Sequence, residues 1–204
     1  KVSPLFKSGD PVLPTNYRPI SQLSSLSKIF EKVVFSQCND FLITNKIIHE
    51  YQFGFRENHG CNHALLLTIN ELEASRNKNL FSIIISIELK KAFDTVNVSK
   101  ILPAKLQHYF KNTDTCNLLS SFFHQRQQYV QMNNTKSSLT NNLDISVVQG
   151  SSLGPPMFSL YINDLPDVTN MLTILFADDT NCIVSGKNLK SLEKQVNDEL
   201  IKIK

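Results

Sequence analysis

The sequence lacks the features that mark several common protein classes. Its four cysteines lie far apart and form no CxxC pair, which argues against a disulfide framework and for reduced thiols inside a cell. The longest apolar runs, at 82–87 and 171–177, fall far short of the roughly 20 residues that a membrane span needs, so no membrane segment is predicted. Lys and Arg outnumber Asp and Glu by only 21 to 18, a net charge of +3, so composition does not single out a nucleic-acid binder.

The chain does contain enough apolar residues for a folded core. It has 204 residues, of which 41% are hydrophobic, and this suits one sizeable core or one domain with a lobe attached. No repeat, low-complexity tract or flexible linker interrupts it. It begins at Lys1 without a secretory signal pattern and is interpreted as an excerpt, so localisation has to be inferred from function.

Hydrophobic periodicity predicts a mixture of helices and strands. The prolines within 1–20 favour extended or looped backbone. Apolar residues at helical spacing predict four helices, the first with a serine N-cap and the third capped by Ser99 so that Pro103 falls in its first turn. These helices are expected at 23–42, 63–79, 99–110 and 189–203. A β-branched run predicts a buried strand at 80–89, and shorter strands are expected at 127–133 and 143–150.

Two adjacent carboxylates, Asp178 and Asp179, interrupt a pair of apolar runs at 172–177 and 181–184. Both runs have strand character, so the acids are predicted to occupy the turn of a β-hairpin. One interpretation is ordinary turn chemistry, because Asp is common in turns. The other is metal binding, because a divalent cation would relieve the repulsion between neighbouring carboxylates. A two-metal site needs further acids, and Glu88, at the end of the strand predicted at 80–89, is the natural source.

A second cluster, "HGCNH", brings three metal-ligating residue types together in the sequence. His59, Cys61 and His63 lie within five positions, but a zinc site needs a fourth ligand and none is visible. A loop or the start of a helix is therefore the favoured interpretation.

Six ordered blocks resemble the reverse transcriptases of non-LTR retrotransposons of the LINE type, similar to jockey. They are "NYRPIS" (16–21), "QFGFRENHGCNHAL" (52–65), "KKAFDTV" (90–96), "QGSSLGP" (149–155), "YINDLP" (161–166) and "FADDT" (176–180). The resemblance covers nearly the whole chain. It implies an α+β fold, a partial right-hand polymerase over 1–204. Fingers are expected at about 1–80 and a palm at about 81–204. The palm would hold an antiparallel sheet flanked by helices, and a thumb would be absent.

The same resemblance assigns the acids to two Mg²⁺ ions, with Mn²⁺ as the alternative. Asp178 would ligate both ions and Asp179 would complete the acidic cluster. Glu88 stands where the family has its first catalytic Asp, and the backbone carbonyl of Leu89 would be a further metal ligand.

The resemblance also implies nucleotide-binding roles for Lys7, Arg18, Ala92, Phe93, Gln149 and Gly150. Arg18 would hold the triphosphate, to which its guanidinium offers bidentate hydrogen bonds. Lys7 would assist, with a solvated loop lysine as the equal alternative. Phe93, after Ala92, would be the gate that excludes a 2′-hydroxyl, with ordinary core packing as its rival. Gln149 and Gly150 would line the nucleotide pocket.

Two neighbouring positions receive other assignments. Asp94 matches a family Asp outside the metal set and is predicted to cap the following helix. Arg56 is a weaker candidate for contact with template or nucleotide.

Departures from the family pattern point to a decayed or partial copy. Glu88 is one methylene longer than Asp, and Mg²⁺ demands near-ideal geometry. The family's Gly-Val-Pro-Gln-Gly reads here as 146–150 with Ser146 and Val148 in place of the Gly and the Pro, and Pro103 falls where the family has a residue compatible with a helix. The fold is therefore expected to persist while activity is weak or absent.

Three functions follow from these observations. The favoured one is an RNA-directed DNA polymerase domain that acts on an RNA template, a DNA primer and deoxynucleoside triphosphates. The alternative is a catalytically inactive remnant that still binds a primer–template duplex. A third is another metal-dependent nuclease or phosphotransferase, for which a sugar gate at Phe93 would have no purpose. The function implies an intracellular location in cytoplasm and nucleus; the sequence gives no oligomeric state.

Overall fold

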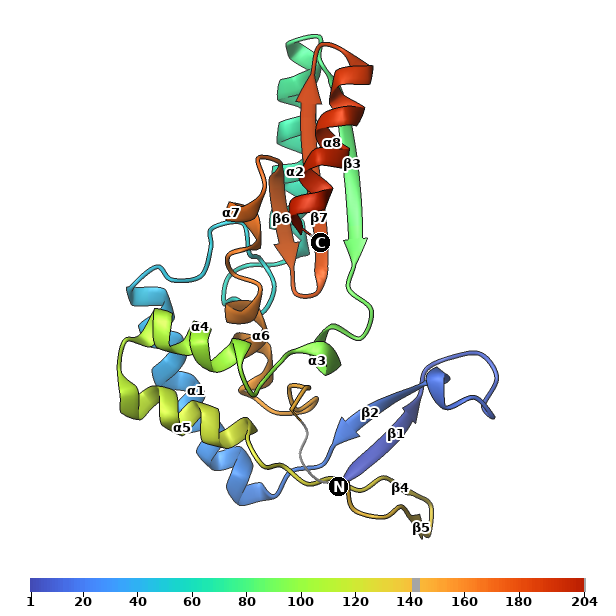
Figure 1. Cartoon of the computed structure of the whole chain (residues 1–204), viewed down its shortest axis with the longest axis vertical. Helices are drawn as coiled ribbons and strands as arrows, with labels where there is room; N and C mark the ends of the chain where they lie inside the picture. Colours follow the sequence, from blue (N-terminus) through green and yellow to red (C-terminus); the bar gives the residue numbers. More distant parts are fainter. Residues whose placement is uncertain (141–143, 204) are drawn as a thin grey trace. The chain divides into compact units, whose positions relative to one another are not determined.

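The computed structural model describes residues 1–140 and 144–203. They form two compact units, each made of two stretches of chain. The first unit comprises Lys1–Asn45 and Lys91–Tyr161, and the second comprises Lys46–Lys90 and Ile162–Lys204. Both combine helices with antiparallel strands, so the predicted α+β class is confirmed (Figure 1).

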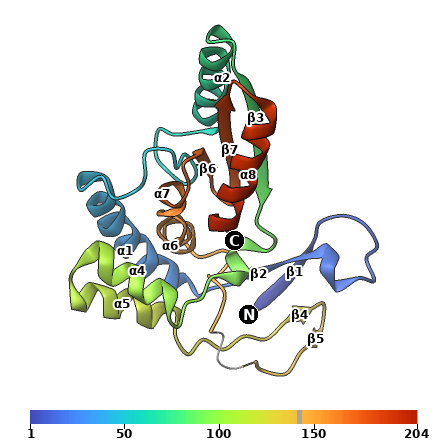
Figure 2. The same cartoon turned by 45° about the horizontal axis from the view of Figure 1, so that its top comes forward.

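The second unit is built on a three-stranded antiparallel sheet in the order β3-β7-β6. Its strands are β3 (Phe81–Glu88), β6 (Leu172–Phe176) and β7 (Asp179–Gly186). Helix α8 (Leu189–Ile203) covers one face, as Figures 1 and 2 both show. The core on this face consists of Met171, Cys182, Val184, Leu192 and Val196. The predicted hairpin and the closing amphipathic helix are therefore confirmed.

The opposite face of this sheet is only partly covered. Helix α2 (Cys61–Asn77) packs there, and the Ser75 hydroxyl donates a hydrogen bond of 2.8 Å to Ser185. Along β3 exposed residues alternate with half-buried ones, and Ile84 is 45% exposed. The prediction of a buried strand at 80–89 is thus right in position and wrong in burial, because alternate β3 side chains point away from α8.

In the first unit, four helices form the main core (Figure 1). They are α1 (Ser25–Thr44), α4 (Ile101–Phe110), α5 (Thr113–Phe123) and α6 (Gly154–Tyr161). The largest buried side chains of this core include Leu42, Leu106, Phe123 and Phe158. Ser24 caps α1 by accepting from the Ser27 amide at 3.1 Å, as predicted.

Helix α4 begins differently from the prediction. The Asn97 side chain accepts from the Lys100 amide at 2.8 Å, so Asn97 and not Ser99 satisfies the free amides at this end. Pro103 is the third residue of the helix, where its missing N–H costs no intrahelical hydrogen bond.

Two hairpins complete the first unit. Strands β1 (Val2–Phe6) and β2 (Tyr17–Ser21) pair across a loop that contains the 3₁₀ turn η1 (Pro14–Asn16), and β4 (Gln131–Met132) pairs with β5 (Thr135–Lys136). A parallel bridge between Val2 and Val130 places the hairpins side by side, as Figure 2 shows. The strand predicted at 143–150 is wrong for 144–150, where the structure has only an isolated bridge at Ile145. Residue 143 lies outside the described part of the chain.

Among the described residues, no helix is long and apolar enough to cross a membrane.

Candidate active site

The two adjacent acids lie at the turn of the β6–β7 hairpin. Phe176 pairs with Asp179, which leaves Ala177 and Asp178 as a two-residue turn. Ala177 has φ +57°, the left-handed conformation that glycine usually supplies at the first position of such a turn. Asp178 is half-buried and Asp179, the first residue of β7, is exposed. The turn thus presents one carboxylate itself and a second at the start of the adjoining strand.

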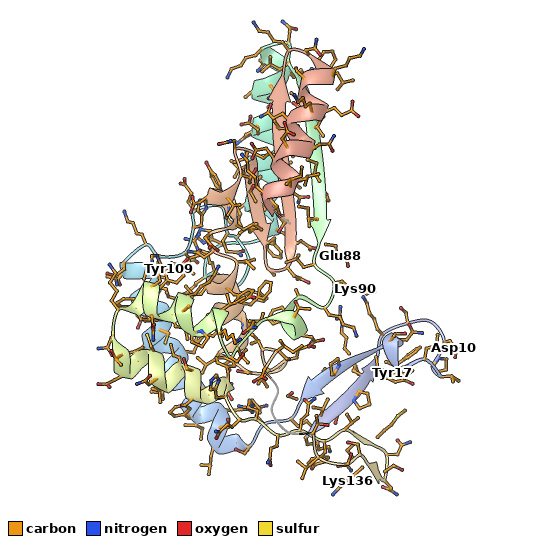
Figure 3. The ribbon with its side chains drawn as sticks, viewed as in Figure 1. Asp10, Tyr17, Glu88, Lys90, Tyr109 and Lys136 are labelled. Atoms are coloured by element: carbon orange, nitrogen blue, oxygen red, sulfur yellow. The ribbon has the colours of Figure 1, made fainter. Side chains whose placement is uncertain are left out.

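Glu88 reaches this turn from a distant part of the chain. It is the last residue of β3 and the Cα partner of Asp179 in β7, so their side chains share one face of the sheet. Figure 3 shows Glu88 at the end of β3, with Lys90 in the loop that follows. Leu89, directly after the strand, is half-buried. The second unit therefore carries all four residues that the sequence predicts as metal ligands at the same end of its sheet.

These carboxylates have no cationic partner within the described residues. No hydrogen bond or ion pair of Glu88, Asp178 or Asp179 to another described side chain is present. Like charges directly opposite each other in a sheet are destabilising, so a cation would relieve this pair. Hard carboxylate oxygens suit Mg²⁺ or Mn²⁺. The described residues nevertheless hold no group of three acidic, His or Cys side chains close enough to bind a metal.

The predicted nucleotide-binding residues all belong to the first unit. Gln149 is held through both its side chain and its main chain. Its side-chain Nε2 donates to Asp94 Oδ1 at 2.7 Å, and its main-chain carbonyl oxygen accepts from the Ser21 amide at 2.9 Å. Gly150 has φ +101°, and a Cβ there would lie 2.9 Å from the Ser21 carbonyl oxygen, so only glycine fits. The prediction that Asp94 caps a helix is wrong: it lies within α3 (Ala92–Thr95) and binds Gln149 instead.

A buried glutamate, Glu31, holds the continuation of this loop. Its side chain is 0% exposed, and it accepts from the Ser152 amide at 2.7 Å and from the Ser27 hydroxyl at 3.1 Å. Burial lowers the pKa of Arg126, and the charge of Glu31 partly offsets that shift. Sequence reasoning missed Glu31. A charged residue amid the apolar positions of the predicted helix at 23–42 was the available signal.

Phe93 follows the buried Ala92 and stacks on Phe158, with ring centroids 4.7 Å apart and planes at 22°. The core packing named as its rival role is therefore present, and the gate stays a prediction. Arg18 is exposed on β2 opposite Leu5. Lys7 follows β1, also exposed, and its amide donates to the Asn16 carbonyl at 2.9 Å. Both cations thus project from the β1–β2 hairpin.

Two other sequence candidates have structural roles. Arg56 Nη1 donates to the carbonyl oxygens of His49 and Gln52 at 3.2 and 3.0 Å, which holds the loop before α2. In the "HGCNH" cluster, His63 Nδ1 accepts from the Gly60 amide at 3.1 Å where α2 begins. This contact fits the predicted helix start.

Sequence reasoning also missed the segment that supports the acidic turn. The Phe53 amide donates to the Leu175 carbonyl, and the Leu175 amide donates to the Tyr51 carbonyl, each at 2.8 Å. A Cβ on Gly54 would lie 2.0 Å from the Ala177 nitrogen, so the two backbones touch. The polar Gln52 and small Gly54 between aromatic residues were the available signals.

Comparison with protein families gives one match over nearly the whole chain. A family model described as "Reverse transcriptase (RNA-dependent DNA polymerase)" matches residues 6–203. Among solved structures, apo telomerase from Candida tropicalis, truncated from its C-terminal domain, aligns with a TM-score of 0.58 at 13% sequence identity. That alignment covers 91% of this chain and 44% of the telomerase. At this identity the likeness shows the fold alone.

Two curated relatives come from mobile elements of Drosophila melanogaster. The probable RNA-directed DNA polymerase from transposon BS is 32% identical over 199 residues, which cover 89% of this chain and 21% of the relative. The RNA-directed DNA polymerase from mobile element jockey is 30% identical over 190 residues, covering 85% of this chain and 20% of the relative. The chain therefore spans about a fifth of the length of these relatives.

Proposed function

The chain belongs to the reverse transcriptase (RNA-dependent DNA polymerase) family of non-LTR retrotransposons, and we propose that it extends a DNA primer on an RNA template. The observation that carries the proposal is the pairing of Glu88 with Asp179, one residue after Asp178. Residues about ninety positions apart thus supply carboxylates to one end of one sheet. Within this proposal, fingers correspond to about 1–80 and the palm to about 81–204.

The acids are the proposed ligands of two Mg²⁺ ions, or of Mn²⁺. Asp178 and Asp179 on the hairpin, Glu88 on β3 and the Leu89 carbonyl form the donor set. When bound, such ions neutralise charge on a transferring phosphoryl group and make a hydroxyl more nucleophilic. Asp178 lies in the two-residue turn, and the sheet register pairs Glu88 with Asp179.

The first unit is proposed to bind the nucleotide. Arg18 and Lys7 are exposed cations suited to a triphosphate, and the planar guanidinium can donate two parallel hydrogen bonds to it. Gln149 and Gly150, held by Asp94 and Ser21, are the proposed pocket lining. Phe93, beside Ala92, is the proposed gate against a 2′-hydroxyl. Its partners would be an RNA template, a DNA primer and deoxynucleoside triphosphates. The protein would act in the cytoplasm and nucleus.

Glu88 is proposed to impair this activity. Its extra methylene moves the carboxylate relative to a family Asp, and a misplacement of about 1 Å at a reacting centre can cost on the order of 10²-fold in rate. A non-catalytic nucleic-acid binder is the second candidate. It is favoured by the same substitution and by the lack of a three-ligand group among the described residues.

Primer extension on an RNA template tests the proposal with the full chain and three variants. We expect Glu88→Asp to extend faster than wild type by about 10- to 100-fold, and Asp178→Asn to abolish extension. The control is Asp198→Asn, an exposed carboxylate on α8. Equal, robust extension by wild type and Glu88→Asp would show that Glu88 does no harm. Extension that survives Asp178→Asn would overturn the polymerase assignment, and duplex binding without metal-dependent extension would select the second candidate.

A further inference from the structure

The acidic turn depends on a residue outside its own hairpin. The side chain of Gln52 is 0% exposed, and its Oε1 accepts from two backbone amides, Gly54 at 2.8 Å and Ala177 at 3.3 Å. Ala177 is the first residue of the turn and directly precedes Asp178. Gln52 Oε1, a buried oxygen, therefore binds the Ala177 amide, which directly precedes the residue that carries the Asp178 carboxylate.

The orientation of the Gln52 amide follows from its neighbours. Both contacts are N–H donors, so the oxygen must face them, and the reversed amide would place donors against donors. This choice leaves Gln52 Nε2 buried without a hydrogen-bond partner among the described residues. Burying a polar atom unpaired is unfavourable, so the buried position of Gln52 costs stability.

The backbone of the turn needs such support. Ala177 has φ +57°, a conformation that is unfavourable for residues with a Cβ and persists only where the surroundings impose it. Residues 51–54 impose it from one side. They pair with Leu175 through two backbone hydrogen bonds and pack Gly54 against the Ala177 nitrogen.

We propose that Gln52 is a positioning residue for Asp178: its Oε1 holds the Ala177 amide and thereby fixes the turn that carries the carboxylate. The inference rests on the proposed function, because the position of Asp178 matters for catalysis only if this carboxylate binds the metal ions. Residues that orient a metal ligand without touching the metal typically contribute 10- to 100-fold in affinity or activity.

The test compares Gln52→Met with a matched control, Thr180→Val, in the full chain. Met keeps the length of the side chain and removes the acceptor. Thr180 is also buried and, like Gln52, pairs with Leu175. Its hydroxyl has no hydrogen-bond partner among the described residues. Thr180→Val therefore removes a buried polar group but breaks no hydrogen bond to the turn. Gly54→Ala is a second variant, which strains the same turn from its other contact.

Two measurements are needed: amide hydrogen exchange at Ala177 and Mn²⁺ affinity. We expect Gln52→Met and Gly54→Ala to speed exchange at Ala177 by about tenfold or more relative to the amides of β7, and to weaken Mn²⁺ binding by about 10-fold. Thr180→Val should change neither. The proposal is overturned if Gln52→Met leaves Ala177 exchange unchanged, or if all variants accelerate exchange across the whole sheet alike, as a general loss of stability would.

Failure of the proposed function gives a different result. In that case wild type and Asp178→Asn bind Mn²⁺ equally, whereas the exchange rate at Ala177 still reports whether Gln52 holds the turn.

Discussion

Glu88 and Asp179 face each other as Cα partners at the end of two antiparallel strands. Both side chains are exposed, lie on one face of the sheet, and have no cationic partner among the described residues. Asp178 directly precedes Asp179 in the chain. Strand register, which is set over the eight pairs from Phe81 to Glu88, thus determines which acids can act together.

Neutralising one acid of this like-charged pair should raise the stability of the fold and weaken metal binding. We expect Asp179→Asn to raise the free energy of unfolding in EDTA by about 0.2–1 kcal/mol, because it removes a repulsive cross-strand pair. The same substitution should weaken Mn²⁺ binding. Urea denaturation with and without Mn²⁺ measures both, with Asp198→Asn as the control. A loss of stability in EDTA would show that the two carboxylates do not repel.

Removal of the Phe93 ring tests the sugar gate against simple packing. We expect Phe93→Ala to accept ribonucleotides more readily relative to deoxyribonucleotides, because the ring would no longer block a 2′-hydroxyl. Primer extension with each nucleotide measures the ratio. Phe122→Ala, another half-buried ring of the first unit, is the control. An unchanged ratio in folded Phe93→Ala would count against the gate and would leave Phe93 only its stack on Phe158.

Ser146, which the sequence resemblance aligns with a glycine of the family, has φ +106°. This conformation is costly for a residue with a Cβ and free of strain for glycine. We therefore expect Ser146→Gly to raise the free energy of unfolding by about 1 kcal/mol, measured by urea denaturation. Ser138→Gly, at an exposed position without a positive φ, should not stabilise the chain. If both behave alike, Ser146 is not strained.

Glu31 should be replaceable by Gln but not by Leu. Gln keeps an oxygen for the Ser152 amide and a donor for the Ser27 hydroxyl, whereas Leu leaves that amide without its partner. Leaving a buried donor unsatisfied costs about 1–3 kcal/mol, the expected loss for Glu31→Leu. Thermal and urea unfolding measure it, with exposed Glu193→Leu on α8 as the control. Equal losses for Gln and Leu would mean that the negative charge beside Arg126 matters more than the hydrogen bonds.

Glu199 should make the docking of α8 sensitive to acid. Hydrogen bonds from Lys202 and Asn170 lower the pKa of this carboxyl from 4.5 to about 2. The folded state therefore binds the proton less readily than the unfolded chain, so the stabilisation is complete above about pH 4.5 and is lost as pH falls toward 2. Denaturation at pH 7 and pH 3 should show a larger loss for wild type than for Glu199→Gln, which cannot titrate. Identical pH profiles would contradict this role.

Much of the second unit's architecture could be predicted from local pattern. The Asp pair between two strand-forming runs and the helical spacing from Leu189 predict β6, β7 and α8 without any knowledge of contacts. Local pattern gave a wrong prediction where contacts with distant residues determine the backbone conformation. The run at 143–150 is rich in strand formers, yet residues 144–150 form a loop held by bonds to Ser21 and Asp94.

The sequence by itself determined which chemical groups the proposed site can use, because its carboxylates, its guanidinium and its glycine-containing loop can be read directly from the residue types. Only the tertiary structure decided their partners. The pairing of Glu88 with Asp179, the capture of Gln149 by Asp94 and the contact of Gln52 with Ala177 span 91, 55 and 125 positions, respectively. Hydrophobic periodicity reports on neighbours a few residues away, whereas such contacts arise when separate elements bury their apolar faces together.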